Sequence, residues 1–467
     1  MTPKATAIYD LIHRGDMDAA REALEEWRLE GGDEFTYWTL FAGWHMRQYL
    51  WGAAIEPLQR AIALQPLGYT SHYNLGYTFH KIGQFNAAAA CYEQALKLNP
   101  NHPQSWVRLG HVCLLTERFA LALACYGYVS VLAPNDQEAR CGYGTALSVF
   151  GDDAAAEKEY RRALELDPAM AEAEMGLGFT LLRAGKWEEG WDRRQASLRH
   201  PPFGSPWNYK VPAYWYGKPK ELFGKRVLLR SEQGHGDTLQ FARYMPLVAK
   251  RAAETWLLTE PSLARLVEGL GAKVITAKDE LPDCEIDTTL MSLPGIFGTR
   301  PDYCPPPAAY KVTARDVGAR VGLCWHGGAR PFDPAAHADD KRRSLPWEAF
   351  APFAETVPCV SLQEEDLRAW GCKDWRDTAE IVKGLDLVIT VDTAVAHLAA
   401  SLGVETWVLS RAGGCWRWLG SGDRTAWYPT MRIYRQVALC EWGPTLERLR
   451  ADLQGWVARH AAQKVAV

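Results

Sequence analysis

Three short segments in the second half of the chain carry side chains suited to chemistry on a phosphorylated ligand. The first runs Glu232-Gln-Gly-His-Gly-Asp237, directly after a short apolar stretch. A glycine-rich turn between a strand and a helix lets backbone amides approach a ligand, and Gly234 and Gly236 would permit that approach. Asp237 would then project from the helix start, where its carboxylate could accept a proton. A purely structural alternative is that Asp237 and Gln240 form a capping box.

The second segment begins with a predicted buried strand, Leu387–Val391, and continues through Asp392-Thr393 into a helix of small residues. A helix start offers unpaired amides and a partial positive charge, which suit a diphosphate. Asp392, Thr393 and Ala394 are therefore candidate phosphate-binding residues. His397 lies four residues after Thr393 and would share its helix face, within reach of a phosphate or sugar oxygen. The alternative is a buried His397 that hydrogen-bonds to backbone carbonyls.

The third segment, 339–347, places three consecutive cations before a helix. Lys341 and Arg343 could neutralise the charge that develops on a leaving diphosphate. A solvated run of charges is the alternative. The segment follows a predicted strand, Val321–Trp325, whose carboxyl end should open on a cleft.

Two further patterns allow more than one interpretation. The aromatic residues around Trp416 and Trp418, with Trp427-Tyr428, could wall a ligand pocket or pack in the core. Glu285-Ile-Asp287 is the nearest approach to an Asp-x-Asp metal motif, and its first residue departs from that pattern. We therefore expect no metal site.

Strands and helices that alternate after residue 204 would position these segments. Strands separated by helical patterns of this length indicate βαβ units and parallel sheets. The prolines near residue 305 suggest a boundary, which divides the region into lobes 205–315 and 316–444, followed by a helix in 445–467. The predicted strands are Arg226–Ser231, Thr255–Thr259, Lys273–Thr276, Val321–Trp325, Cys359–Leu362, Leu387–Val391, Thr406–Ser410 and Arg432–Arg435.

The first 204 residues repeat with a period of 34, which is the period of the tetratricopeptide repeat. They resemble about six such units, each an antiparallel helix pair, so we expect an all-α superhelix that binds a protein or peptide. Its aromatic residues could line the binding face, although most would pack between helices. The recurring positions are Ala20, Ala54, Ala88, Ala122 and Ala156; Gly76, Gly110, Gly144 and Gly178; Tyr92, Tyr126 and Tyr160; and Pro66, Pro100, Pro134, Pro168 and Pro202.

Length and composition bound the remaining possibilities. A chain of 467 residues should hold two or three domains. A net charge of −4 argues against a dedicated nucleic-acid binder. No apolar run is long enough to span a membrane, and no signal peptide is visible. With eleven scattered cysteines, this composition favours a cytoplasmic protein with reduced thiols.

The stretches Glu232–Pro246, Asp392–Leu398, Trp416–Leu419 and Trp427–Met431 resemble bacterial tetratricopeptide-repeat glycosyltransferases. These enzymes are related to ADP-heptosyltransferases and, in architecture, to protein O-GlcNAc transferase. The resemblance implies a GT-B unit of two Rossmann-like lobes, braced by a final helix that crosses back to the first lobe. It implies metal-independent transfer of a sugar from a nucleotide-activated donor, with no cofactor, to protein Ser or Thr hydroxyls. Some relatives glycosylate flagellin, which makes flagellin a possible acceptor.

The resemblance also implies roles for single residues. Asp237 would be the catalytic base, Thr393, Ala394 and His397 would contact the donor phosphates, and Lys341 would bind the donor. His235 and His326 stand where the family has small or apolar residues, and either could compete as base. A scaffold without catalysis and a transferase that acts on a glycan remain alternatives, and UDP-, GDP-, ADP- and CMP-linked donors all remain open.

Overall fold

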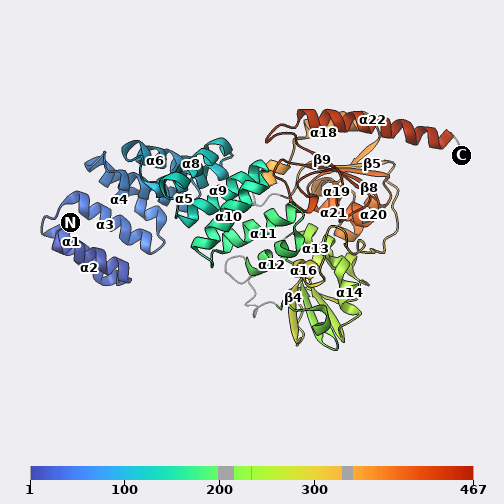
Figure 1. The fold of residues 1–467 in the computed structure, drawn as a ribbon, viewed down its shortest axis with the longest axis horizontal. Coiled ribbons are helices and arrows are strands. Elements are labelled where there is room, and N and C mark those ends of the chain that lie inside the picture. The colour runs from blue at the N-terminus through green and yellow to red at the C-terminus, as the bar shows by residue number, and fades with distance from the viewer. Residues whose placement is uncertain (1, 198–214, 233, 329–339, 466–467) are drawn as a thin grey trace. The chain divides into compact units, whose positions relative to one another are not determined.

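The computed structural model describes residues 2–197, 215–232, 234–328 and 340–465 (Figure 1). An all-helical repeat array is followed by a region of parallel sheets and alternating helices, which confirms the predicted fold class. The proposed linker 201–206, including Pro202, lies outside the described residues. Residue contacts divide the chain into two compact units, Met1–Ala146 and Leu147–Val467, so the last repeats fold together with the α/β region.

The repeat array consists of consecutive helix pairs. Each second helix from α4 to α10 ends two residues before a repeat proline, because proline removes an amide donor and clashes with the preceding turn. The helices are α1 (Pro3–Arg14), α2 (Met17–Leu29), α3 (Glu34–Arg47), α4 (Trp51–Leu64), α5 (Tyr69–Lys81), α6 (Phe85–Leu98), α7 (Pro103–Leu115), α8 (Phe119–Leu132), α9 (Gln137–Phe150), α10 (Asp153–Leu166), α11 (Ala171–Arg183) and α12 (Trp187–Ser197).

Small residues at the repeat positions let paired helices approach closely. The recurring alanines Ala54, Ala88 and Ala122 are fully buried. A Cβ atom added to Gly110 on α7 would lie 2.9 Å from the ring of Tyr126 on α8. The glycine and tyrosine phases of the repeat are therefore the two sides of one helix–helix contact.

The first lobe is built on a four-stranded parallel sheet with the order β3-β2-β1-β4. Strand β4 was not predicted from the sequence, whereas the other strands lie where they were expected. The strands are β1 (Arg226–Arg230), β2 (Glu254–Leu258), β3 (Lys273–Ile275) and β4 (Ile286–Thr289), and the helices are α13 (His235–Phe241), α14 (Met245–Ala249), α15 (Pro261–Val267) and α16 (Leu293–Ile296).

The second lobe is built on a five-stranded parallel sheet with the order β6-β5-β7-β8-β9. Every residue of the central strand β7 is buried, as a strand covered on both faces requires. The strands are β5 (Val321–Cys324), β6 (Cys359–Ser361), β7 (Leu387–Val391), β8 (Glu405–Ser410) and β9 (Met431–Arg435), and the helices are α18 (Trp347–Ala354), α19 (Glu364–Ala369), α20 (Trp375–Lys383) and α21 (Ala394–Ser401).

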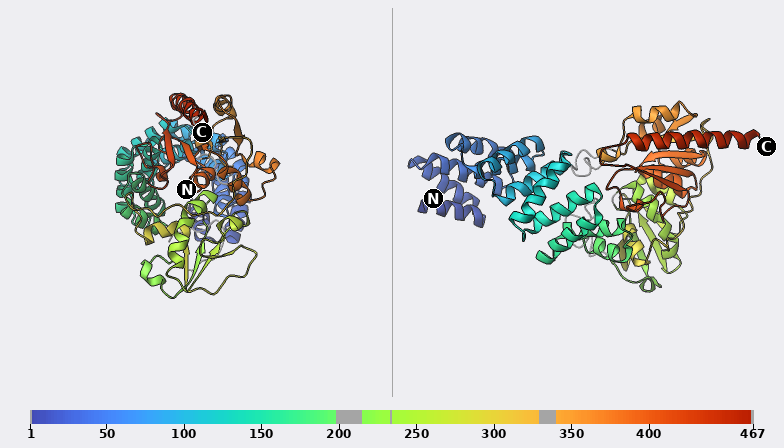
Figure 2. Two further views of the ribbon diagram at one scale, coloured as in Figure 1. Left: turned by 90° about the vertical axis from the view of Figure 1, so that its right-hand side faces the viewer. Right: turned by 45° about the horizontal axis from the view of Figure 1, so that its top comes forward.

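The final helix α22 (Gly443–Val465) packs on the second lobe beside α18 (Figure 2). Leu449, Leu453 and Trp456 form one apolar stripe and are buried in the same core as Trp407 and Tyr434 of the second sheet. This stripe covers one face of the second sheet, and bracing of the first lobe by the same helix stays a prediction.

No helix within the described ranges combines the length and the apolar character that a membrane span requires.

The glycine–tyrosine contact predicts a local loss of stability on enlargement. Gly110→Ala should destabilise the α7–α8 pair by about 1–3 kcal/mol, because the added methyl group overpacks against Tyr126. The free energy of local opening can be measured by native-state hydrogen exchange of residues 103–132 in the full chain.

Gly43→Ala in α3 is the matched control, since a Cβ atom there meets nothing within 4 Å. It should stabilise its helix by about 0.4–1 kcal/mol, because alanine has less backbone entropy to lose. Equal protection in the two variants would contradict the packing argument.

Candidate active site between the two lobes

The candidate site lies where α13 of the first lobe packs against α21 of the second. Both helices begin directly after the carboxyl ends of central strands, β1 and β7. Gly236 lies in this contact: a Cβ atom there would lie 3.0 Å from His397 Cδ2 and 3.3 Å from Ala394 Cα. The fold thus brings together two of the segments that the sequence singled out separately.

Asp237 occupies the third position of α13. The backbone amide of Gly234 donates to Asp237 Oδ2 at 2.9 Å, and Arg417 Nη2 donates to Asp237 Oδ1. Gly234 is the N-cap of the helix and Asp237 is the last member of its capping box. The structural role for Asp237 is therefore confirmed, but the partner is Gly234 and not Gln240. Since a carboxylate has about four acceptor sites, Asp237 retains capacity for a further hydrogen bond.

Arg417 is the residue that organises the site, and the sequence did not single it out. Its Nε donates to Gln240 Oε1 at 2.6 Å and its Nη1 to Cys415 Sγ at 3.1 Å. Its guanidinium lies 4.4 Å from the centroid of the Trp416 ring. Burial opposes the charge, but Cys415 and Asp237 outweigh burial and raise the pKa of Arg417 above its usual value.

His397 is buried, and its Nδ1 lies 3.1 Å from the hydroxyl of Tyr428. The imidazole also stacks on Trp418, with the ring centroids 5.2 Å apart. Burial, assisted by nearby arginines, lowers the pKa of His397 well below its usual value, so the ring is neutral at neutral pH. The partner of His397 Nδ1 is a tyrosine hydroxyl. A backbone carbonyl was the expected partner of a buried His397.

Thr393 is the N-cap of α21 and not part of its helical face. Its hydroxyl lies 3.0 Å from the hydroxyl of Thr390 and 3.7 Å from Cys324 Sγ. Thr393 and His397 therefore make different contacts, because the four-residue spacing places two side chains on one face only when both residues are helical.

Arg343, from the cationic segment, lies at the start of α21. Arg343 Nη1 donates to the backbone carbonyl of Asp392 at 2.7 Å, and Arg343 also pairs with Asp340 at 2.7 Å. Lys341, two residues earlier, is exposed. Burial raises the pKa of Asp392 despite the opposing effect of nearby arginines, chiefly Arg343.

The two histidines that could compete as base lie in different surroundings. His235 Nε2 pairs with Glu260, and the ring packs edge-on against Trp375 with the centroids 5.5 Å apart. The hydrogen bond from His235 lowers the pKa of Glu260. His326 Nδ1 lies 3.0 Å from the carbonyl of Gly327.

The aromatic residues Trp416, Trp418, Trp427 and Tyr428 are all buried in one core that both lobes share. Of the two interpretations given above, core packing is the one that the structure supports. Among the residues that the structure describes, no group of three or more His, Cys, Asp or Glu side chains is arranged to hold a metal ion.

Gly236→Ala should separate the two helices, because a methyl group 3.0 Å from His397 Cδ2 and 3.3 Å from the Ala394 backbone forces a shift of a few tenths of an ångström. We expect faster amide exchange in both α13 and α21. Gly234→Ala is the control, since its Cβ atom meets only Asp237 Oδ2, at 3.5 Å. Unchanged exchange in the Gly236→Ala protein would show that this contact does not hold the lobes together.

The buried His397 also predicts a dependence of stability on pH. The folded protein keeps the imidazole neutral, whereas the unfolded chain binds a proton below about pH 6.5. The contribution of His397 is therefore present above this pH and is lost as the pH falls. The difference in urea midpoint between the native protein and His397→Gln should shrink between about pH 7.5 and about pH 5.5; a constant difference would mean that His397 titrates normally.

Comparison with known proteins identifies the repeats as tetratricopeptide repeats. Models of the tetratricopeptide repeat match residues 69–102 and 142–190. Protein FlbA of Caulobacter vibrioides is 26% identical over 333 residues, which are 60% of this chain and 54% of FlbA, so the chain spans about half the length of this curated relative. Similar solved structures include MamA from Desulfovibrio magneticus RS-1 (23% identity, 36% of this chain and 95% of that chain, TM-score 0.33). Another is YrrB, a TPR protein with an unusual peptide-binding site (22% identity, 38% and 91%, TM-score 0.33).

Proposed function

We propose that the chain is a glycosyltransferase that moves a sugar from a nucleotide-activated donor to Ser or Thr hydroxyls of a protein held by the repeats. The observation that supports this most directly is the contact of α13 with α21 at Gly236. It gathers a carboxylate, arginines and a helix start at the carboxyl ends of two parallel sheets, where α/β proteins bind their ligands.

The donor diphosphate would bind at the start of α21. Unpaired amides and the helix dipole favour negative charge there, and Arg343 is within reach because it hydrogen-bonds to the Asp392 carbonyl at the same helix start. Fixed dipoles and cations of this kind stabilise the charge on a departing phosphate. This proposal gives no role to a metal ion.

In the transfer step the acceptor hydroxyl oxygen attacks the anomeric carbon of the sugar. The new carbon–oxygen bond forms as the bond from the sugar to the phosphate breaks, and the nucleotide leaves with the electron pair on its phosphate oxygen. The hydroxyl proton passes to Asp237, a transfer that contributes about 10²–10⁴-fold to the rate. A phosphate that approaches Arg417 competes with Asp237 for the guanidinium, which frees Asp237 Oδ1 as an acceptor.

His235 is the alternative base. An imidazole oriented by a carboxylate is a common general base, and Glu260 orients His235 in this way. Asp237 is preferred because it stands at the interlobe contact beside Arg417.

The tetratricopeptide repeats suggest a protein-binding scaffold, and we propose that they deliver the acceptor protein. Flagellin is the acceptor that the resemblance to repeat-containing transferases suggests, and a cytoplasmic reaction would fit it.

The test of transfer is intact-mass analysis of proteins captured with this chain in its native host, with and without the gene. The wild-type gene should produce a sugar-sized mass increase on a captured protein, and Asp237→Asn should abolish the increase while donor binding persists. Asp283→Asn is the matched control, because Asp283 is 92% exposed and pairs with Arg226 at the opposite end of β1. If Asp237→Asn stays active and His235→Gln does not, His235 is the base.

Donor binding is tested separately by titration calorimetry with UDP-, GDP-, ADP- and CMP-linked sugars. Arg343→Met should weaken binding of the preferred donor by about 10–100-fold, since a charge-assisted hydrogen bond contributes roughly 1.5–3 kcal/mol and each 1.4 kcal/mol is about tenfold. No binding of any donor, together with no mass increase, would leave the scaffold as the function.

A further inference from the structure

The last repeat departs from the others at one buried position. Tyr92, Tyr126 and Tyr160 recur every 34 residues, and the next residue in this series is Arg194 on α12. A Cβ atom added to Gly178 of α11 would lie 2.8 Å from the backbone nitrogen of Arg194, whereas the matching glycine of an earlier repeat, Gly110, faces a tyrosine ring. In place of a tyrosine ring, this position carries a buried cation, and its guanidinium contacts a residue outside the helix pair.

Arg194 reaches the first lobe. Its Nη2 donates to Glu232 Oε1 at 3.2 Å, and the two side chains are only 2% and 5% exposed. Glu232 begins the glycine-rich segment that carries Asp237. Two more contacts fix α12 to this lobe: Ser292 donates to Gln195 at 2.9 Å, and Trp191 Nε1 donates to the carbonyl of Thr299 at 3.3 Å.

A second buried arginine, Arg183 at the end of α11, reaches the other lobe. Its Nη1 donates to the carbonyls of Gly413 and Gly414, at 2.9 and 3.1 Å, and Asp153 neutralises its charge. The amide of Gly420 donates back to the carbonyl of Arg183 at 2.9 Å. These three glycines flank the turn Trp416–Trp418, which carries Arg417.

We infer that the α11–α12 pair positions the reacting groups, through Arg194 on the Asp237 segment and Arg183 on the Arg417 turn. The Asp237–Arg417 pair joins two lobes, so both segments must be held in register for it to form. One helix pair that binds both segments supplies that register. Arg183 and Arg194 are positioning residues, and their effect on turnover rests on the proposed transferase function.

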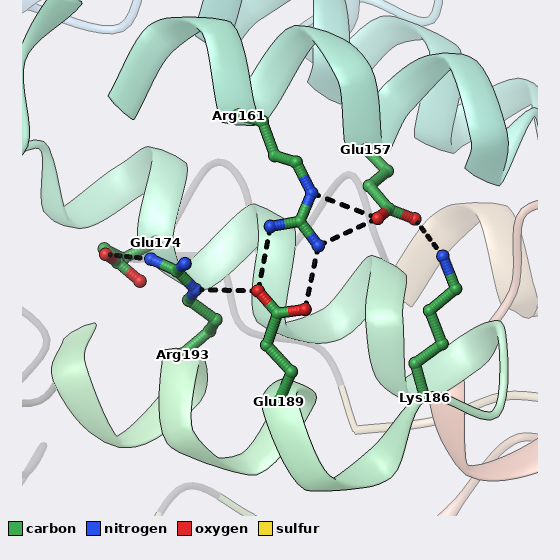
Figure 3. A network of polar contacts seen from close by, with 6 residues as sticks. All are labelled: Glu157, Arg161, Glu174, Lys186, Glu189 and Arg193. Atoms are coloured by element: carbon green, nitrogen blue, oxygen red, sulfur yellow. Dashed lines mark hydrogen bonds and ion pairs between the residues drawn. The ribbon is translucent and has the colours of Figure 1, made fainter. Parts of the chain in front are cut away.

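The energetics of buried charges support this role over plain stabilisation. A buried ion pair contributes little net stability compared with apolar residues of equal volume, because desolvation offsets the attraction. The surface of the same helices provides the contrast: Arg161, Arg193 and Lys186 pair with Glu157, Glu174 and Glu189, joining α10, α11 and α12 to one another (Figure 3). Those pairs join the repeat helices, whereas Arg183 and Arg194 also bind the two site segments.

The test compares Arg183→Met and Arg194→Met with Arg193→Met in the full chain. Arg193 is the matched control, because it neighbours Arg194 on α12 but pairs with Glu174 and Glu189 in the surface network. Amide exchange should quicken in residues 411–422 of Arg183→Met and in residues 231–237 of Arg194→Met, and in neither segment of Arg193→Met. If Arg194→Met fails to fold, Glu232→Gln takes its place, because glutamine keeps the shape of the side chain without its charge. Glu232→Gln should then quicken amide exchange in the same segment.

Turnover of the donor supplies a second readout. Small misplacement of reacting groups can cost about 100-fold, so we expect kcat to fall by about 10–100-fold in both variants. In Arg194→Met, which leaves the contacts of the Arg417 turn in place, the donor KM should change by less than about twofold. Guanidinium added to Arg183→Ala should restore part of kcat, which a general loss of folding would not allow.

Wild-type rates of amide exchange in both segments of the Arg183 and Arg194 variants would overturn the inference. An equal loss of amide protection in Arg193→Met would also overturn it. Exchange does not depend on turnover. If the native chain turns over no donor, the proposed function fails, and the exchange result still decides whether these arginines position the two segments.

Discussion

The guanidinium of Arg417 is charged and almost completely buried, and the arrangement of the two lobes depends on groups that satisfy this charge. A buried cation needs a carboxylate and hydrogen-bond acceptors close by, since water no longer solvates it. Asp237 and Gln240 supply these from the first lobe, while Cys415 supplies one from its own turn. Because the carboxylate and the cation come from different lobes, the ion pair can form only when both sheets present their carboxyl ends to one another.

Two conditions make this arrangement possible. The start of α13 must approach α21 closely, which Gly236 allows because it has no side chain. The turn that carries Arg417 must also hold its place without a strand or long helix of its own. The end of α11 meets this need, since Phe179 stacks parallel to Trp416 and Arg183 binds the glycines on the amino side of the turn. The repeat array is therefore part of the α/β unit at its last helix pair.

The sequence-based predictions were most accurate where the interacting residues are close together in the sequence. The repeats were predictable because small residues and tyrosines recur at a spacing that one helix pair sets. Strand β4 was missed because Ile286–Thr289 is short, has a single aliphatic residue and contains an aspartate, which strands disfavour. In the structure its threonines are buried, and Asp287 pairs with Arg230 of β1. Arg417 and Arg194 gave no local signal, since their carboxylate partners are 180 and 38 residues away in the sequence.

The charges of the candidate site are paired before any ligand arrives. Arg343 is matched by Asp340, Arg417 by Asp237, and Asp392 lies among arginines that oppose the rise in its pKa. A diphosphate that bound here, as proposed, would compete with these carboxylates for the cations. At Arg343 this competition would release Asp340, and at Arg417 it would release the carboxylate proposed as the base. Under the proposed function, donor binding and activation of Asp237 would then be one electrostatic event.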